Sequence, residues 1–133
     1  MKGKTMRLVL AGMAISAVTA SAHHSFGATY DMKTEVRMEG KVIQVLLRNP
    51  HSFLLLEAPD AGGTVQRWSL EWKGSRALAK AGITADTLKK GDALVVTLNP
   101  SRRPSDPRGV LSALHRDSDG LTWDAHPKKH PKS

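Results

Sequence analysis

The order in which strand-like and helix-like segments follow one another limits the possible folds of this chain more than any other feature. Three segments with the alternation or apolar run of a β-strand, residues 35–48, 53–58 and 65–72, precede one short helical pattern at 74–82. Strand-like segments then follow at 93–98, 110–116 and 121–125, separated by glycine- and proline-rich turns. The sequence therefore predicts a mainly β domain that contains a single helix.

The first strand pattern is long and changes character at Gly40. Val36, Met38 and Val42 share one face, whereas beyond the glycine apolar residues occupy both faces, which indicates a strand that bends or bulges. A long bent first strand lets a small Greek-key barrel use one strand in both of its sheets. With the helix between strands 3 and 4, this predicts a small OB-like Greek-key barrel of five to six strands.

The first 22 residues have the pattern of a secretory signal peptide. Three basic residues among the first seven precede an uncharged apolar run at 8–20, which is shorter than the roughly 20 residues of a membrane-spanning helix. The tripeptide Ala-Ser-Ala at 20–22 then fits the rule for cleavage. An uncleaved N-terminal anchor is the alternative. We expect residues 1–22 to be removed, which leaves a periplasmic or secreted protein that begins at His23.

Cleavage would leave 111 of the 133 residues, enough for one compact domain. We assign residues 23–34 to an N-terminal arm, 35–125 to the barrel and 126–133, HPKKHPKS, to a basic disordered tail. No cysteine is present, so no disulfide supports the fold. Three of the 20 basic residues lie in the signal, which leaves 17 against 12 acidic residues. This excess suits an anionic ligand or an anionic envelope surface, although solubility alone also explains it.

Basic residues gather in the two loops that flank the ligand face of an OB-fold, residues 48–52 and 99–109. The candidate ligand-binding residues there are Arg48, His51, Arg102, Arg103 and Arg108. Guanidinium and imidazole groups on one rim suit a carboxylate, phosphate or sulfate, although proline-rich loops also take arginine for solubility. The first functional hypothesis is therefore a non-enzymatic module that binds a small or anionic ligand at this rim.

Two histidines open the expected mature chain and give a second hypothesis. His23 would offer both an α-amine and an imidazole, and His51 or His115 could complete a histidine brace. Nitrogen ligands in a tetragonal arrangement suit Cu(II), which lies at the top of the divalent affinity order. The alternative function is thus a copper-binding protein that uses His23, His24 and His51, as a carrier or an oxidative site. A loose arm whose histidines only follow the cleavage site is the plain explanation.

The arm has to return along the barrel if His23 is to meet His51. Twelve residues separate His23 from the start of the first strand, a reach of about 40 Å. His51 is expected at the far end of that strand. Phe26 and Tyr30 are the arm residues able to pin such a return against apolar surface.

Several short motifs carry a family resemblance. They are HHSFGATYD at 23–31, NPHS at 49–52, WSLE at 68–71, GSRAL at 74–78 and TLKKGDALVV at 87–96. In this order they resemble a family of small exported bacterial proteins, a domain of unknown function with an HHSF-like start, an Asn-Pro-His turn and a Leu-Lys-x-Gly-Asp segment. The chain departs from that pattern at Arg76, in its arginine-rich loop and in its tail. The resemblance implies a secreted OB-like barrel and brings no activity.

Other functional classes lack support in the sequence. There is no glycine-rich phosphate loop, H-E-x-x-H motif or nucleophile elbow, so we predict no catalytic residue. Nucleic-acid binding needs exposed aromatic side chains among basic ones. Trp68 and Trp72 alternate with Leu70 and are expected to face the core, and an exported protein does not meet the usual nucleic acids. We therefore expect no nucleic-acid partner.

Overall fold

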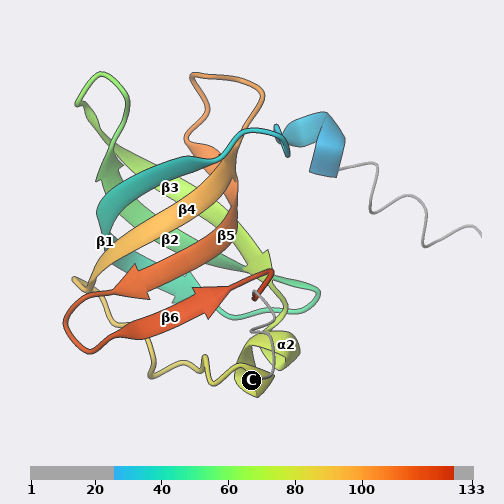
Figure 1. Ribbon diagram of the computed structural model, residues 1–133, viewed down its shortest axis with the longest axis vertical. Coiled ribbons are helices and arrows are strands. Elements are labelled where there is room, and N and C mark those ends of the chain that lie inside the picture. The colour runs from blue at the N-terminus through green and yellow to red at the C-terminus, as the bar shows by residue number, and fades with distance from the viewer. Residues whose placement is uncertain (1–25, 128–133) are drawn as a thin grey trace, which may run out of the picture.

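The computed structural model describes residues 26–127, which form a closed β-barrel with one helix at its lower end (Figure 1). The elements are β1 Val36–Leu46, β2 His51–Pro59, β3 Val65–Lys73, α2 Ser75–Lys80, β4 Ala93–Pro100, β5 Arg108–Arg116 and β6 Leu121–Asp124. The predicted mainly β class and the helix between strands 3 and 4 are confirmed, whereas a second short helix at residues 26–29, drawn before β1 in Figure 1, was not predicted.

The strand pairing is that of a small OB-like barrel. The strands follow the order β3-β2-β1-β4-β5-β6, and an additional pairing between β3 and β5 closes the first five into a barrel. That closing pair is parallel and sets Ser69 opposite Arg108 and Glu71 opposite Val110, whereas the other pairs are antiparallel. β6 extends the sheet beyond β5. The closure matters for function because it brings the start of β5 beside the middle of β3.

β1 bends as its sequence predicts. Its first half pairs with β4 and its second half with β2, and the register shifts between Val42 and Gln44. At Gly40 the strands approach so closely that a Cβ atom would lie 2.6 Å from the carbonyl oxygen of Glu57. A side chain at this position would therefore push β1 away from β2. The glycine lets one strand serve both sides of the barrel.

The core fills the barrel interior and continues beneath it to the helix. Alternate residues of β2 and β3 point inward, so that Leu54, Leu70 and Trp72 are buried, while Trp68 is partly buried against the same cluster. Leu78 of α2 is fully buried and closes the lower end. Each such side chain contributes roughly 2 kcal/mol through the water it avoids. The inward-facing residues fix which β3 side chains remain outside, Glu71 among them.

Some expectations fall on parts of the chain that the structure does not describe. The expected signal peptide, residues 1–22, the histidines His23 and His24, and residues 128–133 of the expected tail all lie outside the described residues. Within residues 26–127, no helix is long and apolar enough to span a bilayer.

Candidate functional site

The N-terminal segment is fastened to the barrel by the loop that precedes β5. Tyr30 forms an isolated β-bridge with Ser101. Arg102 donates its backbone N–H to the carbonyl oxygen of Thr29 at 3.0 Å, and its Nε donates to the carbonyl oxygen of Gly27 at 2.7 Å. The arginine-rich loop therefore holds the chain's own N-terminal segment.

A carboxylate on the outer face of β3 joins this segment to the start of β2. Glu71 accepts a hydrogen bond from the Tyr30 hydroxyl at 3.0 Å, and its other oxygen lies 2.6 Å from Nδ1 of His51. Tyr30 is 5% exposed. Burial, followed by the bond to Glu71, raises the pKa of Tyr30 to about 12. Both oxygens of one carboxylate are thus used to position two other side chains.

His51 is held at one ring nitrogen and leaves the other available. The bond from Nδ1 to Glu71 fixes the ring, so Nε2 keeps its lone pair in the neutral imidazole. The His51 side chain remains 39% exposed. The Phe26 ring packs edge-on against it with centroids 5.3 Å apart. Phe26 and Tyr30 therefore do return along the barrel, and the described chain begins in contact with His51.

Two cavities meet at this histidine. A small one of about 310 Å³ is lined by Phe26, Thr29, Tyr30, His51, Glu71 and Arg108. A larger one of about 820 Å³ shares Phe26, His51 and Glu71 with it and extends toward α2 and the end of β6. The Glu71 carboxylate and the His51 imidazole therefore line both cavities.

The structure brings together two of the five residues expected at the rim. Arg108 reaches the small cavity with His51 because the parallel closure places it diagonally from Glu71. Asp106 binds the Arg108 guanidinium through both of its oxygens, at 2.6 to 2.9 Å. That bond lowers the pKa of Asp106. Arg48, Arg102 and Arg103 are exposed and line neither cavity.

Sequence reasoning assigned no function to Glu71 and did not anticipate that the Tyr30 hydroxyl forms a hydrogen bond. Glu71 falls on the polar face of an alternating strand, where solvation is the ordinary explanation. One signal was available: the short turn between β2 and β3 sets a register in which His51 pairs with Lys73 and Glu71 with Phe53. That register puts the carboxylate diagonally next to the imidazole.

Of the three expected copper ligands His23, His24 and His51, the structure describes His51 alone. Among residues 26–127 no group of three or more histidine, cysteine, aspartate or glutamate side chains is arranged to hold a metal ion. His115, the other candidate for a brace, lies near the end of β5 with Nε2 2.8 Å from Asp117. A metal site at His51 would therefore need ligands from outside residues 26–127.

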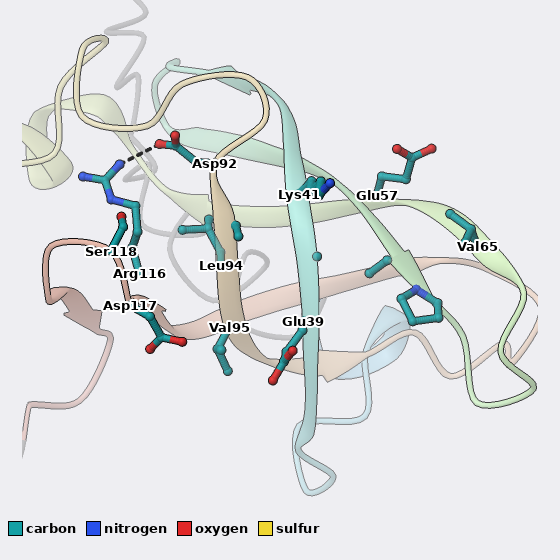
Figure 2. A pocket seen from close by; sticks show the side chains of 14 residues that line it. Glu39, Lys41, Glu57, Val65, Asp92, Leu94, Val95, Arg116, Asp117 and Ser118 are labelled. Atoms are coloured by element: carbon teal, nitrogen blue, oxygen red, sulfur yellow. Dashed lines mark hydrogen bonds and ion pairs between the residues drawn. The ribbon is translucent and has the colours of Figure 1, made fainter.

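A second surface groove, of about 800 Å³, lies over β1 and the start of β4. Figure 2 shows the Arg116 guanidinium directed at Asp92 along one side of this groove, with Glu39 and Asp117 along its length. Arg116 binds Asp92 at 2.6 Å, Asp119 at 2.7 Å and the carbonyl oxygen of Thr87 at 2.7 Å. Its charge is already compensated by carboxylates of the chain.

The fold and this site define a small OB-like barrel with a carboxylate-bound histidine beneath its N-terminal segment. The family of unknown function DUF6152 matches residues 11–110, and the chain belongs to this family. The resemblance to a small domain of unknown function is thereby confirmed. No curated protein and no solved structure matches the chain.

Proposed function

We propose that this protein is an exported binding module that holds Cu(II) at its mature N-terminus, with His51 as the ligand from the barrel. The observation that carries the proposal is the contact between Phe26 and His51, whose Nδ1 is already bound by Glu71. A histidine oriented by a carboxylate, with its second nitrogen free, is the usual form of a metal ligand.

The short stretch of chain between the expected mature N-terminus and Phe26 supports the same site. His23 and His24 precede Phe26 by three and two residues. Three extended residues span about 10 Å, so the α-amine and imidazole of a chain that begins at His23 have enough length to reach His51. Cleavage after Ala22 would create this amine, and the proposal therefore includes export and processing at that position.

The proposed donors are all nitrogen atoms: one α-amine and the imidazoles of His23 or His24 and His51. This set prefers Cu(II) among the divalent ions, whereas Mg²⁺ and Ca²⁺ prefer oxygen ligands. Glu71 holds the orientation of the His51 ring through its bond to Nδ1.

The anion-binding rim is a weaker proposal. Arg108 is occupied by Asp106, and Arg102 is occupied by the backbone of the N-terminal segment. Both arginines are used inside the chain: Arg102 holds the N-terminal segment that leads to His51, and Arg108 binds Asp106 within its own loop.

The test is calorimetric titration of Cu(II) into protein whose first residue is verified by mass as His23. We expect binding of one equivalent, and a loss of more than about a hundredfold when one alanine precedes His23 or when His51 becomes alanine. His115→Ala is the matched control, because His115 also lies against a carboxylate. The affinity of this variant for Cu(II) should equal that of the unmodified protein. Equal binding by all four proteins, or none by the processed protein, would contradict the proposal.

The processing step has its own measurement. Protein recovered from the periplasm or medium of the expressing bacterium should have the mass of residues 23–133. An intact N-terminus, or a first residue other than His23, would remove the amine on which the copper site depends.

A further inference from the structure

The larger cavity beside His51 has a different chemistry from the proposed copper site. It measures about 820 Å³, within the range of small-molecule sites. Residues from the N-terminal segment, β3, the start of α2, β5 and the stretch just after β6 line it. These segments are far apart in the sequence and meet only because the barrel closes.

Its surface combines apolar side chains with two cations. The apolar part includes Trp72, Val110 and Leu111. Lys73 and Arg76 also line the cavity, are exposed, and form no ion pair with any residue in 26–127. Glu71 lines it too, but both of its oxygens are engaged by His51 and Tyr30.

Trp72 lines the cavity from the side of the barrel core. Its side chain is 3% exposed and packs edge-on against Trp123 with centroids 5.3 Å apart. The Nε1 atom is buried and meets no acceptor among the described residues. Buried donors without acceptors are uncommon because they lose water and gain nothing in return. This donor lies in the barrel core, so Trp72 contributes only apolar surface to the cavity.

We infer that this cavity binds a small carboxylic acid with an apolar body. The apolar part of the molecule contacts Val110 and Leu111, and its carboxylate lies toward Lys73 and Arg76. Guanidinium and ammonium groups without partners select an anion, and the apolar lining selects a molecule that also carries hydrocarbon. The inference goes beyond copper binding and does not depend on it.

The chain's own tail is a poor occupant of the same cavity. It leaves the described residues next to His126, which lines the cavity, so its position alone would allow it to enter. Its sequence carries Lys128, Lys129 and Lys132, the same sign of charge as Lys73 and Arg76. Like charges repel in this partly enclosed surface, so a separate anionic molecule fits better.

The test uses decanoate and 4-phenylbutyrate, each paired with the alcohol of the same length, in the presence of a chelator. Calorimetry measures the four affinities for the full processed protein. We expect saturable binding of at least one acid, at least about tenfold tighter than its alcohol. Failure of both acids to bind, or equal affinity for acid and alcohol, would overturn the inference.

Two sets of variants locate the binding. Lys73→Ala with Arg76→Ala should remove the preference for acid over alcohol, by about tenfold, and leave the affinity for the alcohol unchanged. Lys89→Ala with Lys90→Ala is the matched control, since these exposed lysines do not line the cavity. Ala77→Phe, at an exposed position of the lining, should weaken both ligands by filling the cavity. Loss of preference in the control, or its persistence in the first pair, would place the site elsewhere.

Discussion

Two networks of polar and charged side chains, one around Glu71 and one around Arg116, differ in whether they leave an atom free to bind a ligand. At Glu71, one carboxylate accepts from a phenol and an imidazole, and the imidazole keeps a free nitrogen at a 39% exposed side chain. At Arg116, two carboxylates and a carbonyl oxygen share one guanidinium, whose side chain is 15% exposed. The first network leaves an atom for a ligand, and the second leaves none.

The charges of the two networks reinforce this difference. The bond from Arg116 lowers the pKa of Asp119 to about 2, and the same contact raises the pKa of Arg116. Groups held so firmly in their charged forms are compensated by each other and stabilise the turn before β6. The groove near Arg116 is therefore structural, although it is about as large as the cavity at His51. The size of a cavity does not distinguish a site from a surface hollow; an unsatisfied atom does.

The largest effect that we expect is the loss of affinity for Cu(II) in Glu71→Gln. The amide has a single acceptor oxygen in place of the two that serve His51 and Tyr30, and it lacks the charge that orients the imidazole. We expect the affinity for Cu(II) to fall about 10- to 100-fold. The measurement is copper competition against a chromogenic chelator, with thermal unfolding of the metal-free protein recorded in parallel.

The Glu71→Gln result discriminates only if the fold persists. Unchanged copper affinity in a protein that still folds would show that Glu71 does not position His51. Asp117→Asn is the control, because it alters the other histidine–carboxylate pair, and it should bind copper like the unmodified protein.

Arg116→Ala should have the opposite effect: it should lower the stability of the fold and leave the affinity for Cu(II) unchanged. The side chain bonds Asp92, Asp119 and a backbone carbonyl, and its removal leaves the two carboxylates with only their backbone N–H donors. We expect the free energy of unfolding to fall by about 2 kcal/mol, seen as a decrease in Tm of roughly 10 °C. A weakened copper site in folded Arg116→Ala protein would break the distinction between the two networks.

The sequence predicted the barrel because its signals are local. Alternation in β3 sends Leu70 and Trp72 inward, the glycine in β1 marks the bend, and the short helical pattern appears between strands 3 and 4. The site depends on pairings between distant segments. Tyr30 and Glu71 are 41 residues apart, and nothing near either one indicates the contact.

The arginine-rich loop shows why local chemistry was insufficient. Three arginines in a proline-rich segment suggested a surface for outside anions. Arg108 instead pairs with Asp106, two residues before it, and Arg102 binds the backbone of the N-terminal segment. Charge in a sequence identifies what a loop can bind, whereas the fold decides whether the chain itself supplies the partner.

The smallest expected effect tests the hydrogen bond from the buried Tyr30 hydroxyl to Glu71. Tyr30 is the sole tyrosine of the chain, so its ionisation can be followed by ultraviolet absorbance without interference from another phenol. We expect a midpoint near pH 12 in the native protein and near the ordinary value of about 10 after unfolding in urea. Because the folded pKa is the higher one, this group stabilises the fold fully below pH 10, and its contribution is lost as the pH rises through 12. Glu71→Gln removes one of the two acceptor oxygens and the negative charge but not the burial of Tyr30, so the midpoint of Tyr30 in this variant should lie between the two values. A native midpoint near 10 would mean that Tyr30 is not held against Glu71, and the N-terminal segment would then keep only the Phe26 contact with His51.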